Sequence, residues 1–233
     1  MNASAAVLLD IEGTTTPISF VHRILFPYAA AAVEEFLRLH RAPESAAEVR
    51  AACQAVLEDA TAQELALGES AAVLAVVRRQ MAADVKATGL KQLQGLIWQR
   101  GYESGALRGE LFDDVPSCLR RWQDAGRPVA IYSSGSRLAQ QLLFRYSVAG
   151  DLTPQLSGYF DTTSGPKREA ASYAAIAAAW GQPPEQVIFC SDVPAECTAA
   201  AGAGMQAVLI MRPGNAPLPA LLDFPVHADL TRI

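Results

Sequence analysis

Positive charge is scarce in this chain. Only three of its 233 residues are lysines, no run of basic residues occurs, and the formal net charge is −5. Surfaces that bind nucleic acids are usually strongly basic. We therefore expect no nucleic-acid partner.

Long apolar runs and a leader segment are also missing. No apolar stretch approaches the roughly 18 residues that a membrane-spanning helix needs. The N-terminus has no basic region ahead of an apolar one, and Asp10 interrupts the first apolar run early. The expectation is a cytoplasmic protein with no membrane partner.

The four cysteines show no CxxC spacing. One lies in an apolar run and one on the face of a predicted helix, which is typical of buried thiols in a reducing cytosol. The four are Cys53, Cys118, Cys190 and Cys197. Apolar residues make up 51% of the chain, which is enough for a packed core. The length suits one large domain or a core with a smaller one.

The first candidate for chemistry is Asp10. It follows the apolar run 5–9, which predicts a buried strand of a parallel sheet. Ligands of open α/β sheets bind just beyond the carboxyl ends of such strands. Glu12 points the same way as Asp10 if the strand continues. Two converging carboxylates suit a divalent cation or a nucleophile paired with an acid or base, and a solvated turn is the alternative.

Strand and helix patterns alternate in the second half of the chain. Apolar runs predict strands at 128–132, 187–190 and 207–211. Helical patterns lie between them at 114–123, 136–146 and 167–180. Such alternation predicts an α/β fold, a Rossmann-like parallel sheet with helices on both faces.

Residues from about 26 to 101 show no strand pattern. Their apolar residues recur at helical spacing, which predicts about four helices, the last ending at Gly101. We predict an all-helical cap at residues 18–107, inserted into a catalytic core formed by 1–17 and 108–233. An insertion at this point would hang over the carboxyl edge of the sheet, where a lid would act.

Further polar residues follow the later strands. Ser133 and Ser134 follow one strand, Asp192 follows another, and Lys167 opens a predicted helix. Each has a plain alternative, namely a helix cap for the serines, the start of a loop for Asp192 and a solvated surface position for Lys167. Together with Asp10 they supply what phosphoryl transfer needs: acids for a metal and for attack, and donors for the phosphate oxygens.

These residues resemble a known family. The segments Asp10-x-Glu12-Gly13-Thr14-Thr15, Ser133-Ser134-Gly135, Gly165-x-Lys167 and Ser191-Asp192 look like the four ordered motifs of the haloacid dehalogenase-like phosphatase superfamily. Most members have Asp where this chain has Glu12. The Glu variant, with Thr-Thr-Pro-Ile-Ser-Phe after it and the stretch 93–105, resembles the acireductone synthase branch, the enolase-phosphatases of methionine salvage.

The resemblance implies a Mg²⁺-dependent phosphatase with enolase activity. Its substrate would be 2,3-diketo-5-methylthiopentyl 1-phosphate, converted to the acireductone 1,2-dihydroxy-3-keto-5-methylthiopentene and phosphate. Asp10 would attack phosphorus. Asp10, Asp192 and the main-chain carbonyl of Glu12 would hold Mg²⁺. The Glu12 side chain would protonate the leaving oxygen.

The remaining site residues would bind the substrate. The resemblance assigns the phosphate to the Ser133 hydroxyl, the N–H of Ser134 and Lys167, and Lys167 would also balance the charge of Asp10. We expect a monomer whose partner is this small phosphate ester. The alternatives are a generic phosphomonoesterase or dehalogenase on the same scaffold and a catalytically silent binding module, because a fold does not fix a substrate.

Overall fold

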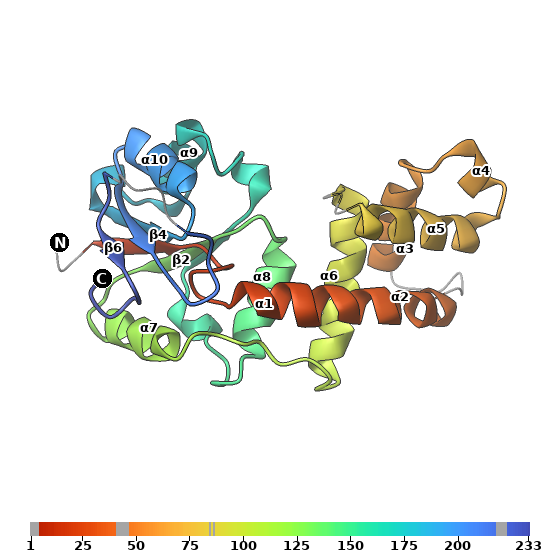
Figure 1. The fold of residues 1–233 in the computed structure, drawn as a ribbon, viewed down its shortest axis with the longest axis horizontal. Helices are drawn as coiled ribbons and strands as arrows, with labels where there is room; N and C mark the ends of the chain where they lie inside the picture. Colours follow the sequence, from red (N-terminus) through yellow and green to blue (C-terminus); the bar gives the residue numbers. More distant parts are fainter. Residues whose placement is uncertain (1–4, 41–46, 84, 86, 218–222) are drawn as a thin grey trace. The chain divides into compact units, whose positions relative to one another are not determined.

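The computed structural model describes residues 5–40, 47–83, 85, 87–217 and 223–233. The chain forms two compact units, Met1–Val21 with Arg108–Ile233, and His22–Leu107. The second unit is thus an insertion in the first (Figure 1).

The larger unit is built on a parallel sheet of six strands in the order β3-β2-β1-β4-β5-β6. The strands are β1 (Ala6–Leu9), β2 (Val129–Tyr132), β3 (Gly158–Phe160), β4 (Val187–Ser191), β5 (Gln206–Ile210) and β6 (Val226–His227). The first strand of the chain lies in the middle, between β2 and β4. The strand order therefore reverses beside β1, and such a switch point is where open α/β sheets bind ligands.

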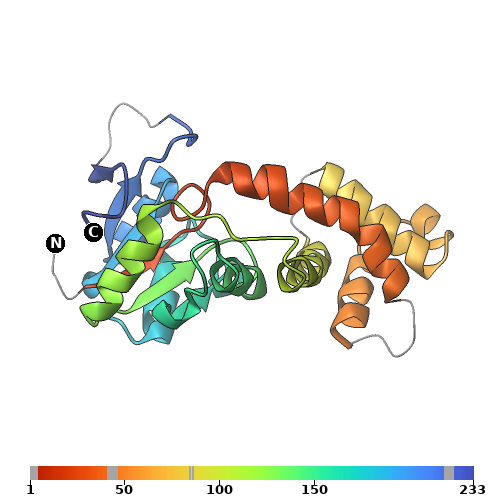
Figure 2. The ribbon, with the colours of Figure 1, turned by 90° about the horizontal axis from the view of Figure 1, so that it is seen from below.

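Helices cover both faces of this sheet, which confirms the predicted fold class. Figure 1 shows α9 (Ala170–Trp180) and α10 (Pro194–Gly202) on one face, and Figure 2 looks onto the other face, which α7 (Asp114–Asp124) crosses. The helix α8 (Arg137–Arg145) contacts β3. Every residue of β1, β2 and β4 is buried, as expected for strands with helices on both sides.

Three details differ from the sequence prediction. The strands β3 and β6 were not predicted, because three and two residues are too few to show a periodic pattern. The helix predicted from Lys167 begins at Ala170 instead. Lys167 lies in a turn after Gly165, whose φ of 124° and ψ of 171° are incompatible with a helix.

The smaller unit contains helices and no strand among its described residues. A three-residue helix α1 (Ile18–Phe20) and a π-helical turn (Val21–Leu25) lead into it. Its helices are α2 (Phe26–Leu39), α3 (Ala47–Leu57), α4 (Ala62–Leu65), α5 (Glu69–Ala82) and α6 (Thr88–Glu103). The prediction of about four helices missed the one-turn α4.

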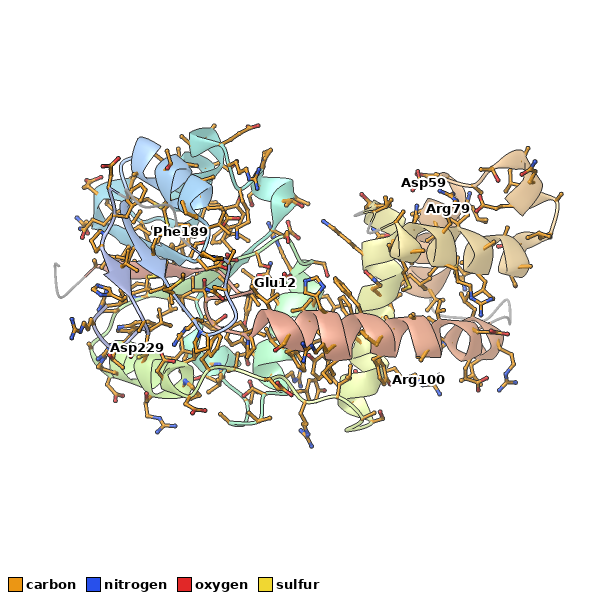
Figure 3. All side chains as sticks on the ribbon, viewed as in Figure 1. Glu12, Asp59, Arg79, Arg100, Phe189 and Asp229 are labelled. Atoms are coloured by element: carbon orange, nitrogen blue, oxygen red, sulfur yellow. The ribbon has the colours of Figure 1, made fainter. Side chains whose placement is uncertain are left out.

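Short polar contacts fasten α4 to its neighbours. Thr61 and Glu64 form a reciprocal capping box at its N-terminus. Glu64 also pairs with Arg79 of α5 at 2.9 Å, and Arg79 donates to the carbonyl of Asp59 in the turn after α3. Figure 3 labels Asp59 and Arg79 in this cluster. These contacts explain why so short a helix forms.

Gly101 does not end α6, contrary to the prediction. The helix continues through it to Glu103. A Cβ on Gly101 would lie 2.7 Å from the ring of Tyr28, so the glycine makes room for α2 rather than stopping the helix. In the same unit the Trp98 indole donates to the carbonyl of Leu25, at the end of the π-helical turn.

The described part of the chain includes no helix with both the length and the apolarity needed to cross a membrane. All four cysteines are free thiols, three of them buried and Cys53 partly so.

Candidate active site

The strand register brings the candidate residues to one edge of the sheet. Leu9 of β1 pairs with Ile131 on one side and with Cys190 on the other. The next residues, Asp10, Tyr132 and Ser191, therefore lie level, and Ser133 and Asp192 follow one step later. This register agrees with the prediction that these residues lie together at the carboxyl edge of the sheet.

Lys167 lies between two carboxylates. Its Nζ is 2.6 Å from Oδ1 of Asp10 and 2.6 Å from Oε2 of Glu196, and the three side chains are only 6–11% exposed. Burial opposes the charged ammonium, but the charges of Asp10 and Glu196 outweigh it and raise the pKa of Lys167. A lysine that looked in sequence like a surface residue is thus a charged group of the interior.

Glu196 is the residue that sequence reasoning missed. It lies in the first turn of α10, where an acidic side chain is common and carries no signal of chemistry by itself. Burial and the nearby charge of Asp10 raise its pKa to about 7. The available signal was its position: Glu196 lies in the first turn of the helix that follows the strand end, close enough for its carboxylate to contact Ser191.

Ser191 connects the two carboxylates. Its hydroxyl lies 3.0 Å from Oδ2 of Asp10 and 2.9 Å from Oε2 of Glu196, and it accepts the N–H of Val193. Asp10 is held further by the N–H of Ile11 at 2.7 Å. The carboxylate of Asp10 is therefore held by Ile11, Ser191 and Lys167 together.

Three hydroxyls hold the turn that carries Lys167. Tyr132 donates to the carbonyl of Gly165 at 2.9 Å, Ser172 to that of Pro166 at 2.8 Å and Tyr173 to that of Lys167 at 2.7 Å. Two of these hydroxyls belong to α9 and one to β2, so the lysine is positioned by the sheet and its covering helix together.

Asp192 approaches the loop after β1. A Cβ on Gly13 would overlap its carboxylate, so only glycine fits there, and Gly13 has a φ of 71°. Burial, and then the charge of Asp10, raise the pKa of Asp192 to about 6, with a smaller contribution from Glu12. Figure 3 labels Glu12 in this loop.

Ser133 and Ser134 do not cap the following helix. The N-cap of α8 is Ser136, whose hydroxyl accepts the N–H of Ala139. Ser133 is 3% exposed, and its hydroxyl accepts the N–H of Gly135 at 3.3 Å. The capping alternative is therefore wrong, and both serines occupy the loop between the strand end and the cap.

The site carries excess negative charge. The carboxylates of Asp10, Glu12, Asp192 and Glu196 act on one another around Lys167. Oxygen ligands and negative charge fit a hard divalent cation. Among the described residues no three His, Cys, Asp or Glu side chains form a ready-made metal cluster. The ligands of such an ion would be two carboxylates, a main-chain carbonyl and oxygens from water or substrate.

The same arrangement of motifs defines a class of protein. A family model described as haloacid dehalogenase-like hydrolase matches residues 5–204. The chain belongs to the haloacid dehalogenase-like hydrolase family. The resemblance drawn from the four motifs is confirmed.

Within this family the chain is similar to proteins named enolase-phosphatase E1. The one from Synechococcus elongatus is 54% identical over 213 residues, which are 90% of each chain. The one from Drosophila melanogaster is 46% identical over 217 residues, covering 91% of this chain and 85% of the relative. Among solved structures, the UTR4 protein of Saccharomyces cerevisiae has a TM-score of 0.82 and 35% identity, covering 99% of this chain and 100% of that one.

Proposed function

We propose that this chain is the enolase-phosphatase of methionine salvage. It enolises 2,3-diketo-5-methylthiopentyl 1-phosphate and then hydrolyses the phosphate ester. The observation that carries the proposal is the buried ion pair of Lys167 and Asp10, 2.6 Å apart, at the switch point of the sheet. The similarity to proteins named enolase-phosphatase E1, at 54% identity, supports the choice of substrate.

Asp10 is the proposed nucleophile. One of its carboxylate oxygens forms a bond to phosphorus as the bond to the ester oxygen breaks, and water then cleaves the aspartyl phosphate. Lys167 holds this carboxylate in place and offsets the charge that gathers on the phosphate. The Ser133 hydroxyl and the N–H of Ser134 bind phosphate oxygens.

Mg²⁺ is the proposed metal. Asp10, Asp192 and the main-chain carbonyl of Glu12 would hold it, because the two carboxylates follow the paired strands β1 and β4 at the same edge of the sheet. When bound, the ion would neutralise the charge of the phosphate.

Glu12 is the proposed general acid. Its carboxyl group gives a proton to the leaving oxygen as the phosphate departs. Glu replaces the Asp of most relatives, and the extra methylene lets the carboxyl group reach about 1.5 Å further. The helical unit, which enters the chain just after this loop, is proposed to exclude water and to select the methylthio tail.

We also propose that the enzyme is a cytoplasmic monomer. Its four free cysteines support a reducing compartment.

The test is an assay of the diketo phosphate with Mg²⁺ and with EDTA, following phosphate release and the ultraviolet absorbance of the enol. We expect both signals with Mg²⁺ and loss of phosphate release with EDTA. Equal turnover of unrelated small phosphate esters would identify a generic phosphomonoesterase instead. Metal-independent release of halide from a haloacid would identify a dehalogenase.

A further inference from the structure

The turn that follows β5 has no part in the mechanism above. It consists of Arg212, Pro213, Gly214 and Asn215, and the N–H of Asn215 donates to the carbonyl of Arg212 at 3.2 Å. Proline in the second position and a glycine with a φ of 92° in the third match a type II turn. Such a turn brings its first and last residues close together, so the two side chains can act on one neighbouring segment.

That segment is the loop after Glu12. Asn215 donates from Nδ2 to the carbonyl of Gly13 at 2.9 Å and to that of Ile210 at 3.3 Å. Both acceptors are carbonyl oxygens, so the nitrogen end of the amide must face them. Arg212 donates from Nε to the carbonyl of Thr14 at 3.0 Å. The two side chains thus hold the carbonyls of Gly13 and Thr14, the two residues that follow Glu12.

Arg212 is itself rigidly held. It is 6% exposed, and its two terminal nitrogens pair with the carboxylate of Asp114 at 2.7 and 3.0 Å. Its guanidinium carbon lies 4.3 Å from the ring centroid of Phe112. The N–H of Phe112 in turn donates to the carbonyl of Thr15. A bidentate, stacked arginine of this kind has little freedom to move.

The loop reaches Asp10 at its main-chain carbonyl, which accepts the hydroxyl of Thr15 at 3.1 Å, but the reacting carboxylate is held elsewhere. That carboxylate is held by Ile11, Lys167 and Ser191, and the main-chain N–H of Asp10 donates to the carbonyl of Cys190. Loosening the turn should therefore displace Glu12 more than the carboxylate of Asp10.

We propose that Asn215 and Arg212 are positioning residues for Glu12. By fixing the carbonyls of Gly13 and Thr14 they keep the Glu12 carboxyl group at the leaving oxygen. The inference rests on the proposed function only in that Glu12 protonates the leaving group of an ester.

The test uses the leaving group of the substrate. An alkoxide leaves poorly without a proton, whereas p-nitrophenolate leaves without one, so only the alkyl ester needs a well-placed acid. We expect Asn215→Ala, at saturating Mg²⁺, to lower kcat on an alkyl phosphate by about ten- to a hundredfold. On p-nitrophenyl phosphate the loss should stay below about threefold, because Asp10 is intact. Glu12→Gln should likewise lose more kcat on the alkyl phosphate than on p-nitrophenyl phosphate. The double variant of Glu12 and Asn215 should have the same kcat as Glu12→Gln alone.

Arg212→Lys keeps the charge but cannot bind Thr14 and Asp114 together, so it should show a weaker form of the same difference between the two esters. Arg232→Ala, at an exposed position, is the matched control and should show none. Thermal unfolding of each variant reports whether it is folded at the assay temperature. Equal losses on both esters, or losses that add to those of Glu12→Gln, would overturn the proposal. If the wild type does not turn over the diketo phosphate but hydrolyses other alkyl phosphates, the proposed function is wrong. The comparison of the two esters then still tests whether Asn215 and Arg212 position Glu12.

Discussion

Replacing Gly165 by alanine should damage both stability and catalysis. Gly165 has a φ of 124° and a ψ of 171°, a region that is essentially restricted to glycine. An added Cβ would also overlap the hydroxyl oxygen of Ser172 and lie 3.0 Å from its Cβ. That hydroxyl would have to give up its bond to the carbonyl of Pro166, so the turn that carries Lys167 would shift.

The magnitude follows from these two effects. Backbone strain of about 1–3 kcal/mol and a lost hydrogen bond of about 1 kcal/mol together lower the free energy of unfolding by about 2–4 kcal/mol. For a chain of this size that corresponds to a fall in Tm of about 5–15 °C. A displacement of Lys167 by about 1 Å should lower kcat by about a hundredfold.

Calorimetry and a phosphate-release assay measure the two effects. Gly126→Ala is the matched control, because Gly126 also has a positive φ of 67° but nothing lies within 4 Å of its added Cβ. It should lose only about 1–2 kcal/mol and keep its activity. Adding Ser172→Ala to Gly165→Ala should recover part of the stability. If Gly165→Ala matches Gly126→Ala in both Tm and kcat, the reasoning about the Lys167 turn is refuted.

Three further substitutions test individual side chains. Asp10→Asn should abolish phosphate release in a folded protein, because an amide cannot attack phosphorus, and turnover within tenfold of wild type would refute the assignment. Asp192→Ala should weaken Mg²⁺ binding, measured by titration calorimetry, and lower activity by roughly a hundredfold or more; unchanged Mg²⁺ affinity would exclude Asp192 as a ligand. Glu196→Gln keeps the shape but removes one of the two charges on Lys167, so kcat should fall by about tenfold with KM little changed. A kcat within twofold of wild type would show that Asp10 alone positions the lysine.

The sequence predicted those parts of the molecule that depend on local pattern. Buried strands are short apolar runs, and the residue after such a run lies at the sheet edge, so Asp10 and Asp192 could be located without a structure. The helical character of the inserted unit could also be predicted, because the spacing of its apolar residues is a local pattern.

The parts that it did not predict depend on contacts between distant segments. The role of Glu196 requires knowing that Lys167 folds back onto α10. Glycine often ends a helix, but Gly101 lies inside α6 because the ring of Tyr28 leaves no room for a Cβ there. Asn215 follows a turn signal that was visible, yet nothing local shows that its amide reaches Gly13, 202 residues earlier.

The central place of β1 has a consequence for the order in which the molecule assembles. The strand is made first, but one of its two neighbours is β4, which starts at Val187. At a synthesis rate of about 5–20 residues per second, β1 waits about 10–40 s for that partner. The loop that holds Asp10 and Glu12 waits longer still, for Arg212 and Asn215. During synthesis one edge of β1 is thus exposed to mispairing, and the nascent chain stays inactive until it is nearly complete.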